Sequence, residues 1–160
     1  MESHLHELPD DLQRDHAAAT PAARLRTIRQ RLAGTHAEPG STRLVIVVSA
    51  VEALARSLVV HASGRPASTA DMRHRQLRDT GPAELVEEVL RLRGAERAAR
   101  HFGAEPWALF ELAVRYRDLV VHECAALGAE RHAPLIAATD TVFKGLIELA
   151  GLDGRPRVIG

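Results

Sequence analysis

The chain has 160 residues, 21 basic and 21 acidic side chains and no formal net charge at pH 7, so it fits one domain with one core and lacks the basic excess of proteins that hold long duplex nucleic acid. Hydrophobic residues make up 46% and charged residues 26% of the chain, which is ordinary for a globular protein. A single cysteine, Cys124, excludes both a disulfide framework and a cysteine-based zinc site within one chain.

Two features bear on the cellular compartment. The N-terminal residues show no basic segment followed by an apolar one, so we expect no secretory signal. The longest apolar stretch, residues 44–62, contains Ser49, Glu52 and Arg56 and is too polar to span a membrane. We therefore expect a cytoplasmic protein with no membrane partner, and we expect no cofactor and no metal site.

Residues 1–40 resemble an N-terminal arm, and residues 41–160 a helical domain. The first part of the arm is polar and rich in histidine. A short helix is predicted over 21–32, where Leu25, Ile28 and Leu32 share one face. Gly34 is expected to end this helix.

The remaining helices follow from apolar residues at helical spacing. One helix should begin at Ser41 or Thr42, either of which can act as its N-cap, and end before Gly64. Residues 65–81 are polar and interrupted by proline and glycine. Further helices are predicted over 82–92, from about 106 to 126, and from about 134 to 150. No stretch alternates with a period of two, so the predicted fold is an all-α, four- to five-helix bundle.

The helix predicted from 106 to 126 carries an arginine on its apolar face. Phe110, Ala113 and Val114 recur at helical spacing, and Arg117 and Val121 continue the same face. An arginine cannot lose its charge, and burying it without a partner costs several kcal/mol. Arg117 must therefore face a carboxylate, a carbonyl, water or an anionic ligand.

Asp118 and His122 follow Arg117 on the same helix. They lie four residues apart and hence on one face, where a carboxylate orients an imidazole and fixes its tautomer. Arg117 lies about 140° around the helix from His122, so the two meet either by curling of the arginine or across a two-fold axis between two copies. A cation beside a proton-transferring group meets the needs of metal-independent RNA cleavage.

Several alternatives stay open at this point. Glu52 either points at Arg117 from a neighbouring helix or lies in solvent. Ser49 and Tyr116 are candidates for substrate binding or support, although Ser49 also fits a plain helix contact. Arg117 also has a purely structural interpretation, in which it forms an ion pair with an acidic side chain and His122 is simply a surface histidine. The candidate partners for that ion pair are Glu52, Glu111 and Glu123.

The segment Tyr-Arg-Asp-Leu-Val-Val-His-Glu, residues 116–123, resembles the HEPN superfamily (higher eukaryotes and prokaryotes nucleotide-binding domains). The motif of that family is an arginine, four to six further residues and then a histidine, with a polar Asn, Asp or His directly after the arginine. These positions are occupied here by Arg117, Asp118 and His122. Residues 47–54 are similar to the first core helix of that family, where a glutamate often occurs, and residues 84–107 to its middle section. The resemblance covers roughly residues 42–150.

This resemblance implies a bundle that forms a homodimer with its two motifs facing one cleft. Many members are metal-independent endoribonucleases that leave 2′,3′-cyclic phosphate, and many of these are toxins or defence components. The resemblance therefore implies catalytic roles for Arg117 and His122, with Asp118 in support. RNA and a cognate antitoxin or nucleotidyltransferase are the implied partners. One subgroup carries a modifiable tyrosine where this chain has Cys124. The alternative is a non-catalytic HEPN-like module that binds a nucleotide, RNA or a protein, or an unrelated helical scaffold.

Overall fold

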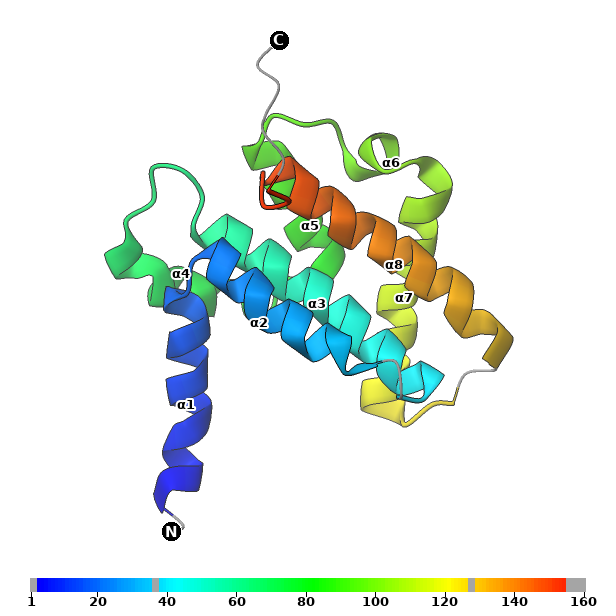
Figure 1. The fold of residues 1–160 in the computed structure, drawn as a ribbon, viewed down its shortest axis with the longest axis horizontal. Helices are drawn as coiled ribbons and strands as arrows, with labels where there is room; N and C mark the ends of the chain where they lie inside the picture. Colours follow the sequence, from blue (N-terminus) through cyan, green and yellow to red (C-terminus); the bar gives the residue numbers. More distant parts are fainter. Residues whose placement is uncertain (1–2, 36–37, 127–128, 155–160) are drawn as a thin grey trace.

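A computed structural model describes residues 3–35, 38–126 and 129–154. Within these ranges the chain is helical and contains no strand, which confirms the predicted all-α class. A short 3-10 turn, Ala67–Thr69, accompanies the α-helices (Figure 1), which are α1 (Ser3–Ala18), α2 (Pro21–Ala33), α3 (Gly40–Val60), α4 (Ala70–Gln76), α5 (Pro82–Leu92), α6 (Ala98–His101), α7 (Ala104–Glu123) and α8 (Ala129–Leu149).

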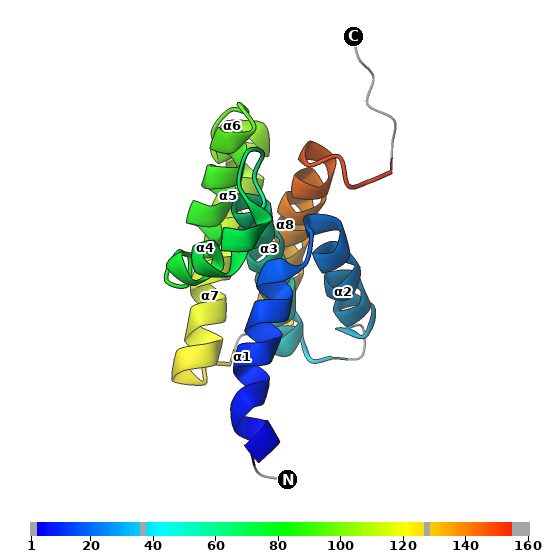
Figure 2. The same cartoon turned by 90° about the vertical axis from the view of Figure 1, so that its left-hand side faces the viewer.

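Helix α3 is the central element of the bundle. It packs against α2, α5, α7 and α8, and α7 also packs along α8. Leu44, Val48, Val51 and Leu54 give α3 a buried face that runs along most of its length. Figures 1 and 2 show α2 and α8 bordering α3 on one side and α5 and α7 on the other. A helix with this many neighbours requires the wide apolar face that its sequence carries.

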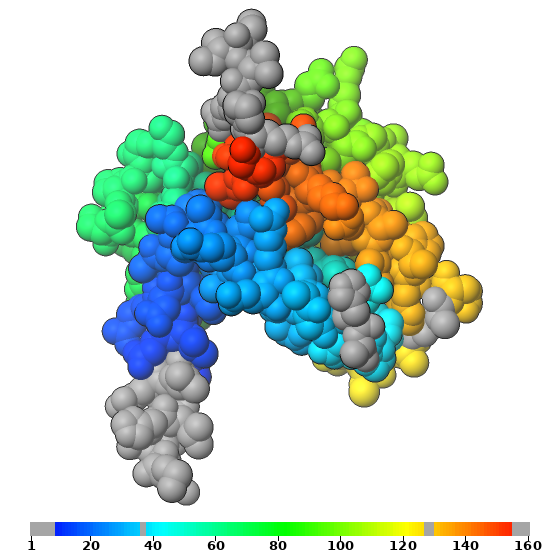
Figure 3. Space-filling view, viewed as in Figure 1, coloured from blue at the N-terminus to red at the C-terminus, as the bar shows by residue number. Residues whose placement is uncertain are grey.

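Helix α2 belongs to the bundle and does not project as an arm. Leu25 and Ile28 are buried in the main core beside residues of α3 and α8. The N-cap is Thr20, whose Oγ1 accepts a hydrogen bond of 3.2 Å from the Ala23 amide, and Pro21 occupies the first turn. Figure 3 shows α2 and α8 on the same face of the molecule, both bordering α3.

Helices α1 and α4 lie in polar segments in which the sequence predicted no helix. Helix α1 extends away from the bundle (Figures 1 and 2), and its C-terminal end is attached by buried Ala17, whose carbonyl accepts a 2.8 Å hydrogen bond from His61 Nε2. Helix α4 is attached by Arg73, which is buried and donates from Nε and Nη2 to the Val60 carbonyl at 2.8 and 2.6 Å. This arginine therefore satisfies a free carbonyl at the end of α3.

Some helix boundaries differ from the prediction. Neither Ser41 nor Thr42 caps α3, which begins at Gly40 without a side-chain cap, and Ser41 Oγ instead lies 3.3 Å from the ring of His132. Helix α8 starts at Ala129, so Pro134 lies inside its first turns. The predicted limits of α5 are confirmed. None of the described helices combines the length and apolar character needed to cross a membrane.

Candidate functional site

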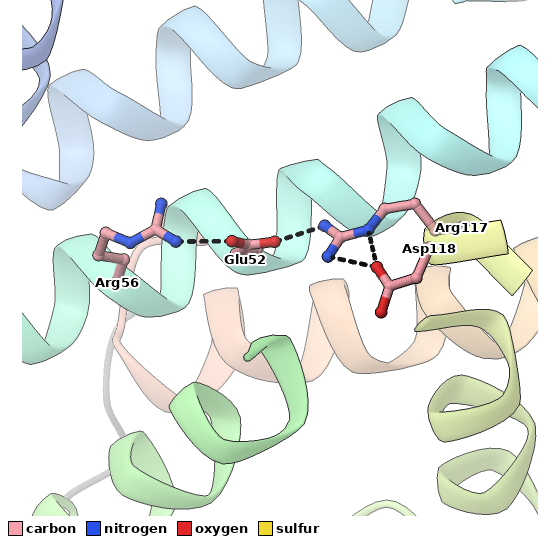
Figure 4. A network of polar contacts seen from close by, with 4 residues as sticks. All are labelled: Glu52, Arg56, Arg117 and Asp118. Carbon is pink, nitrogen blue, oxygen red and sulfur yellow. Dashed lines mark hydrogen bonds and ion pairs between the residues drawn. The ribbon is translucent and has the colours of Figure 1, made fainter. Parts of the chain in front are cut away.

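Arg117 lies at the centre of a network of four charged side chains that joins α7 to α3. Its Nη1 donates a short hydrogen bond to Glu52 Oε2, while its Nε and Nη2 donate to Asp118 Oδ1 at 3.3 and 3.2 Å. Arg56 Nη2 donates to the other Glu52 oxygen at 2.6 Å. Figure 4 shows Glu52 between the two guanidinium groups. Two cations and two carboxylates therefore balance one another within one cluster.

The packing of α7 explains why Arg117 points at α3. Ala113 and Phe110 are buried one and two turns before Arg117 on the same face, because positions four and seven residues apart share a helix face. On α3, Glu52 directly follows buried Val51, at the edge of the core face. The guanidinium and the carboxylate therefore meet where the apolar contact between α3 and α7 ends.

The network is largely, but not fully, removed from solvent. The exposed fraction of the side chain is 15% for Arg117, 17% for Arg56 and 20% for Glu52, whereas that of Asp118 is 50%. Glu52 thus holds Arg117 from the buried side, and Asp118 covers it on the side that solvent reaches. Asp118 is therefore the more exposed of the two carboxylates that bind Arg117.

The electrostatics of Glu52 follow from its two partners. Burial on its own raises the pKa of the Glu52 carboxyl, but the hydrogen bond and charge of Arg117, together with those of Arg56, outweigh burial and hold this pKa below its ordinary value. Glu52 is therefore ionised at neutral pH, which supplies the counter-charge that a largely buried arginine requires.

His122 does not join this network. It lies exposed in the last turn of α7, and Asp118 accepts hydrogen bonds from Arg117 and none from His122. Within the chain the structure therefore brings together Arg117, Asp118 and Glu52 and leaves the His122 imidazole apart. The contact between Asp118 and His122 that their spacing suggested is absent.

The end of α7 around His122 is uncovered. Leu119 and Val121 are 46% and 55% exposed, so two large aliphatic side chains near the end of α7 lie open to solvent. Val121 was predicted to continue the apolar face of Phe110, but it is mostly exposed, whereas Phe110 is fully buried. Helix α7 ends at Cys124, which is exposed and has a left-handed φ of 53°.

Ser49 and Tyr116 lie away from the charge network. Ser49 is exposed and lines a cleft between α2 and α3 of about 390 Å³. Tyr116 is half-buried against a second apolar cluster, formed by Leu44, Val48, Ala113 and Leu135. Both positions fit structural contacts at least as well as contacts with a substrate.

One member of the network, Arg56, was not singled out from the sequence. It lies four residues after Glu52 on α3, a spacing at which oppositely charged side chains meet on a helix. This spacing in the sequence could have predicted the ion pair between Glu52 and Arg56. Over the described part of the chain, no group of three or more His, Cys, Asp and Glu side chains is arranged to hold a metal ion.

Comparison of the chain with models of protein families, with curated proteins and with solved structures finds no significant match.

Proposed function

We propose that this protein is a HEPN-type domain that acts as a homodimer and cleaves RNA without a metal ion. The observation that carries the proposal is Arg117, anchored by Glu52 of α3 with one side open to solvent through Asp118, on the same helix as exposed His122. This pattern agrees with the motif resemblance of residues 116–123. The all-helical fold and the central α3–α7 contact are compatible with it.

The homodimer is part of the proposal because one protomer does not supply the whole site. Arg117 faces α3, whereas His122 lies on the uncovered end of α7 beside exposed Leu119 and Val121. Packing these ends of α7 against each other across a two-fold axis covers Leu119, which shares a helix face with His122. It also brings the imidazole of one protomer toward the guanidinium of the other.

The reaction assigned to this site is transesterification within RNA. The 2′-oxygen attacks the adjacent phosphorus and the bond from phosphorus to the 5′-oxygen breaks, which leaves a 2′,3′-cyclic phosphate and a 5′-hydroxyl. His122 of one protomer accepts the proton of the 2′-hydroxyl and, as the imidazolium, returns a proton to the leaving 5′-oxygen. Arg117 stabilises the charge that develops on the phosphate oxygens. To do so it exchanges its hydrogen bonds to Asp118 for hydrogen bonds to the phosphate.

The test is cleavage of RNA in excess EDTA. His122→Ala should slow cleavage by about 10²–10⁴-fold, the usual contribution of a general acid or base, and Arg117→Ala should also abolish most of it. Arg115→Ala and His101→Ala are matched controls because both side chains are exposed and lie outside the network. Products should end in 2′,3′-cyclic phosphate. Cleavage that persists in both site variants, or that requires Mg²⁺, contradicts the proposal.

A second candidate function is supported by the same ion pairs. Two carboxylates already engage Arg117, and among the described residues none forms a hydrogen bond or ion pair with His122. A non-catalytic HEPN-like module that binds a nucleotide, RNA or a protein requires an anchored cation and a docking surface, and it does not require an oriented histidine. It predicts saturable binding of RNA with no cleavage in the wild-type protein.

A biological role as a toxin or defence component belongs to the same proposal, with a cognate antitoxin or nucleotidyltransferase as partner. It is supported by the motif resemblance alone. Expression of the wild-type chain should then arrest growth, and His122→Ala should relieve the arrest. Equal growth arrest by both chains contradicts this role.

A further inference from the structure

A basic cleft lies at the junction of α1, α2, α3 and α4, on the other side of Arg56 from the Arg117 network. Its volume is about 360 Å³, within the range of small-ligand sites. Figure 2 shows α1 meeting α3 and α4 at this junction. The polar side chains that line the cleft are Gln13, His16, Arg24, Arg56, Ser57, His74 and Arg78.

The charge of this lining is one-sided. Among the described residues that line the cleft, none is acidic, while three are arginines and two are histidines. Arg56 is neutralised by Glu52, and the nearest opposing carboxylate on α4 is Asp71, which pairs with Arg75 at 2.8 Å. Arg24 donates to the Thr27 hydroxyl, a neutral partner. A cleft of this composition concentrates positive charge that an anion would neutralise.

Three buried polar atoms around the cleft have no hydrogen-bond partner. They are Arg56 Nε, Ser57 Oγ and His74 Nδ1. The Ser57 residue is only 5% exposed, so its hydroxyl has little access to bulk water. Buried polar groups are almost always satisfied, and each one left unpaired costs free energy. Several such atoms lining one cleft therefore indicate a ligand with several acceptor oxygens.

The electrostatics of the two histidines agree with this geometry. Burial, and then the charge of Arg24, lower the pKa of His16, with Asp15 opposing. Burial, and then the charge of Arg56, lower the pKa of His74, with Asp71 opposing and with further lowering by His16 and Arg24. The basic groups of the cleft thus repel one another in the absence of an anion.

We propose that this cleft binds a phosphate group of a small molecule, held by Arg24, Arg78 and the Ser57 hydroxyl, with His74 and Arg56 completing the cradle. A phosphate monoester supplies three acceptor oxygens and up to two negative charges, which matches the number of unpartnered atoms and the charge of the lining. Leu12 and Ala53, which also border the cleft, provide an apolar wall for the remainder of the ligand. The site does not depend on the ribonuclease proposal.

The phosphate site is also connected to the Arg117 network through a shared residue, Arg56. Arg56 borders the cleft and at the same time donates to Glu52, the residue that anchors Arg117. A phosphate that attracts Arg56 competes with Glu52 for the same guanidinium. Ligand binding should therefore be detectable at Arg117, for example as a change in the chemical shift of its side-chain Nε.

The experiment is calorimetric titration of the whole chain with inorganic phosphate and with adenosine 5′-monophosphate, at constant ionic strength. Saturable binding of either probe is expected, and tighter binding of the nucleotide shows that the apolar wall contributes. Arg78→Gln and Ser57→Ala should each weaken binding by about tenfold or more, since each removes a hydrogen bond to a charged group. Ser57→Ala should leave the stability of the fold unchanged, because this hydroxyl has no partner in the protein.

Matched control variants distinguish binding at this cleft from non-specific electrostatic attraction of the anion to the protein surface. Arg93→Gln removes an exposed arginine that directly follows α5, as Arg78 closely follows α4, and Ser63→Ala removes an exposed hydroxyl. Both controls should bind the probes as the wild type does. Absence of saturable binding to both probes, or equal weakening by Arg78→Gln and Arg93→Gln, overturns the proposal. Neither result bears on RNA cleavage, which is measured separately.

Discussion

Glu52→Gln tests whether one carboxylate neutralises Arg117 and Arg56 inside the bundle. Breaking a fully buried ion pair costs about 3–5 kcal/mol, whereas an exposed pair contributes about 0–1 kcal/mol. Exposed fractions of 15–20% for Glu52 and its partners lie close to the buried limit. We therefore expect the substitution to lower the free energy of unfolding by about 2–4 kcal/mol, the amide retaining part of the hydrogen bonding.

The assay is urea denaturation followed by circular dichroism, with linear extrapolation to water. For a domain of this size the expected loss corresponds to a melting temperature lower by roughly 5–15 °C. Asp11→Asn is the control, because Asp11 pairs with Arg14 at 2.7 Å while both side chains are about 60% exposed. It should change stability by less than about 1 kcal/mol.

The pH dependence gives a second readout of the same substitution. Since the pKa of Glu52 is lowered in the folded state, its stabilising contribution is complete above the ordinary glutamate pKa, about 4.3, and is lost as the pH falls through the lower folded value. Glu52→Gln should remove this part of the acid-induced loss. A Glu52→Gln effect no larger than that of Asp11→Asn, with an unchanged pH curve, would refute the reasoning.

Three further outcomes are expected. Asp118→Asn should tighten RNA binding several-fold in a filter-binding assay, because Asp118 competes with phosphate for Arg117; weaker binding argues that Asp118 assists the substrate. Replacing Leu119 by serine should raise the dissociation constant of the dimer by about tenfold or more in analytical ultracentrifugation, since burying an aliphatic side chain contributes about 1.5–3 kcal/mol; an unchanged constant places the interface elsewhere. The free energy of unfolding should fall as the pH is lowered from 7.5 to 5.5, because the pKa values of His16 and His74 are lowered in the folded state and the unfolded chain therefore binds these protons at higher pH. A His16→Gln/His74→Gln double variant whose stability changes with pH as steeply as that of the wild type contradicts this.

The helices that the sequence predicted well are those with local boundary signals. Helix α5 has proline in its first turn and glycine just beyond its end, and both of its limits are as predicted. Helix α3 shows its broad apolar face directly in the spacing of its residues. Helices α1 and α4 escaped prediction because their anchors are long-range: the His61 contact to Ala17, and the buried guanidinium of Arg73 at the end of α3.

The site shows the same division between local and long-range information. The need of Arg117 for a partner followed from its place on an apolar face, but the choice of Glu52, 65 residues earlier in the chain, depended on the packing of α3 against α7. The basic cleft was not foreseen at all. Its side chains come from several helices and the segment after α4, and no spacing along the chain connects His16, Ser57 and His74.

The most direct test of the central claim uses dimers that combine an Arg117→Ala protomer with a His122→Ala protomer, isolated through two different tags. Each homodimer of these variants should be inactive on RNA in EDTA. The mixed dimer retains one pairing of an intact Arg117 on one chain with an intact His122 on the other, so the account predicts that cleavage returns to a substantial fraction of the wild-type rate. A mixed dimer as inactive as the two homodimers, assembled from a wild-type protein that does cleave, would contradict a site shared between two copies of α7.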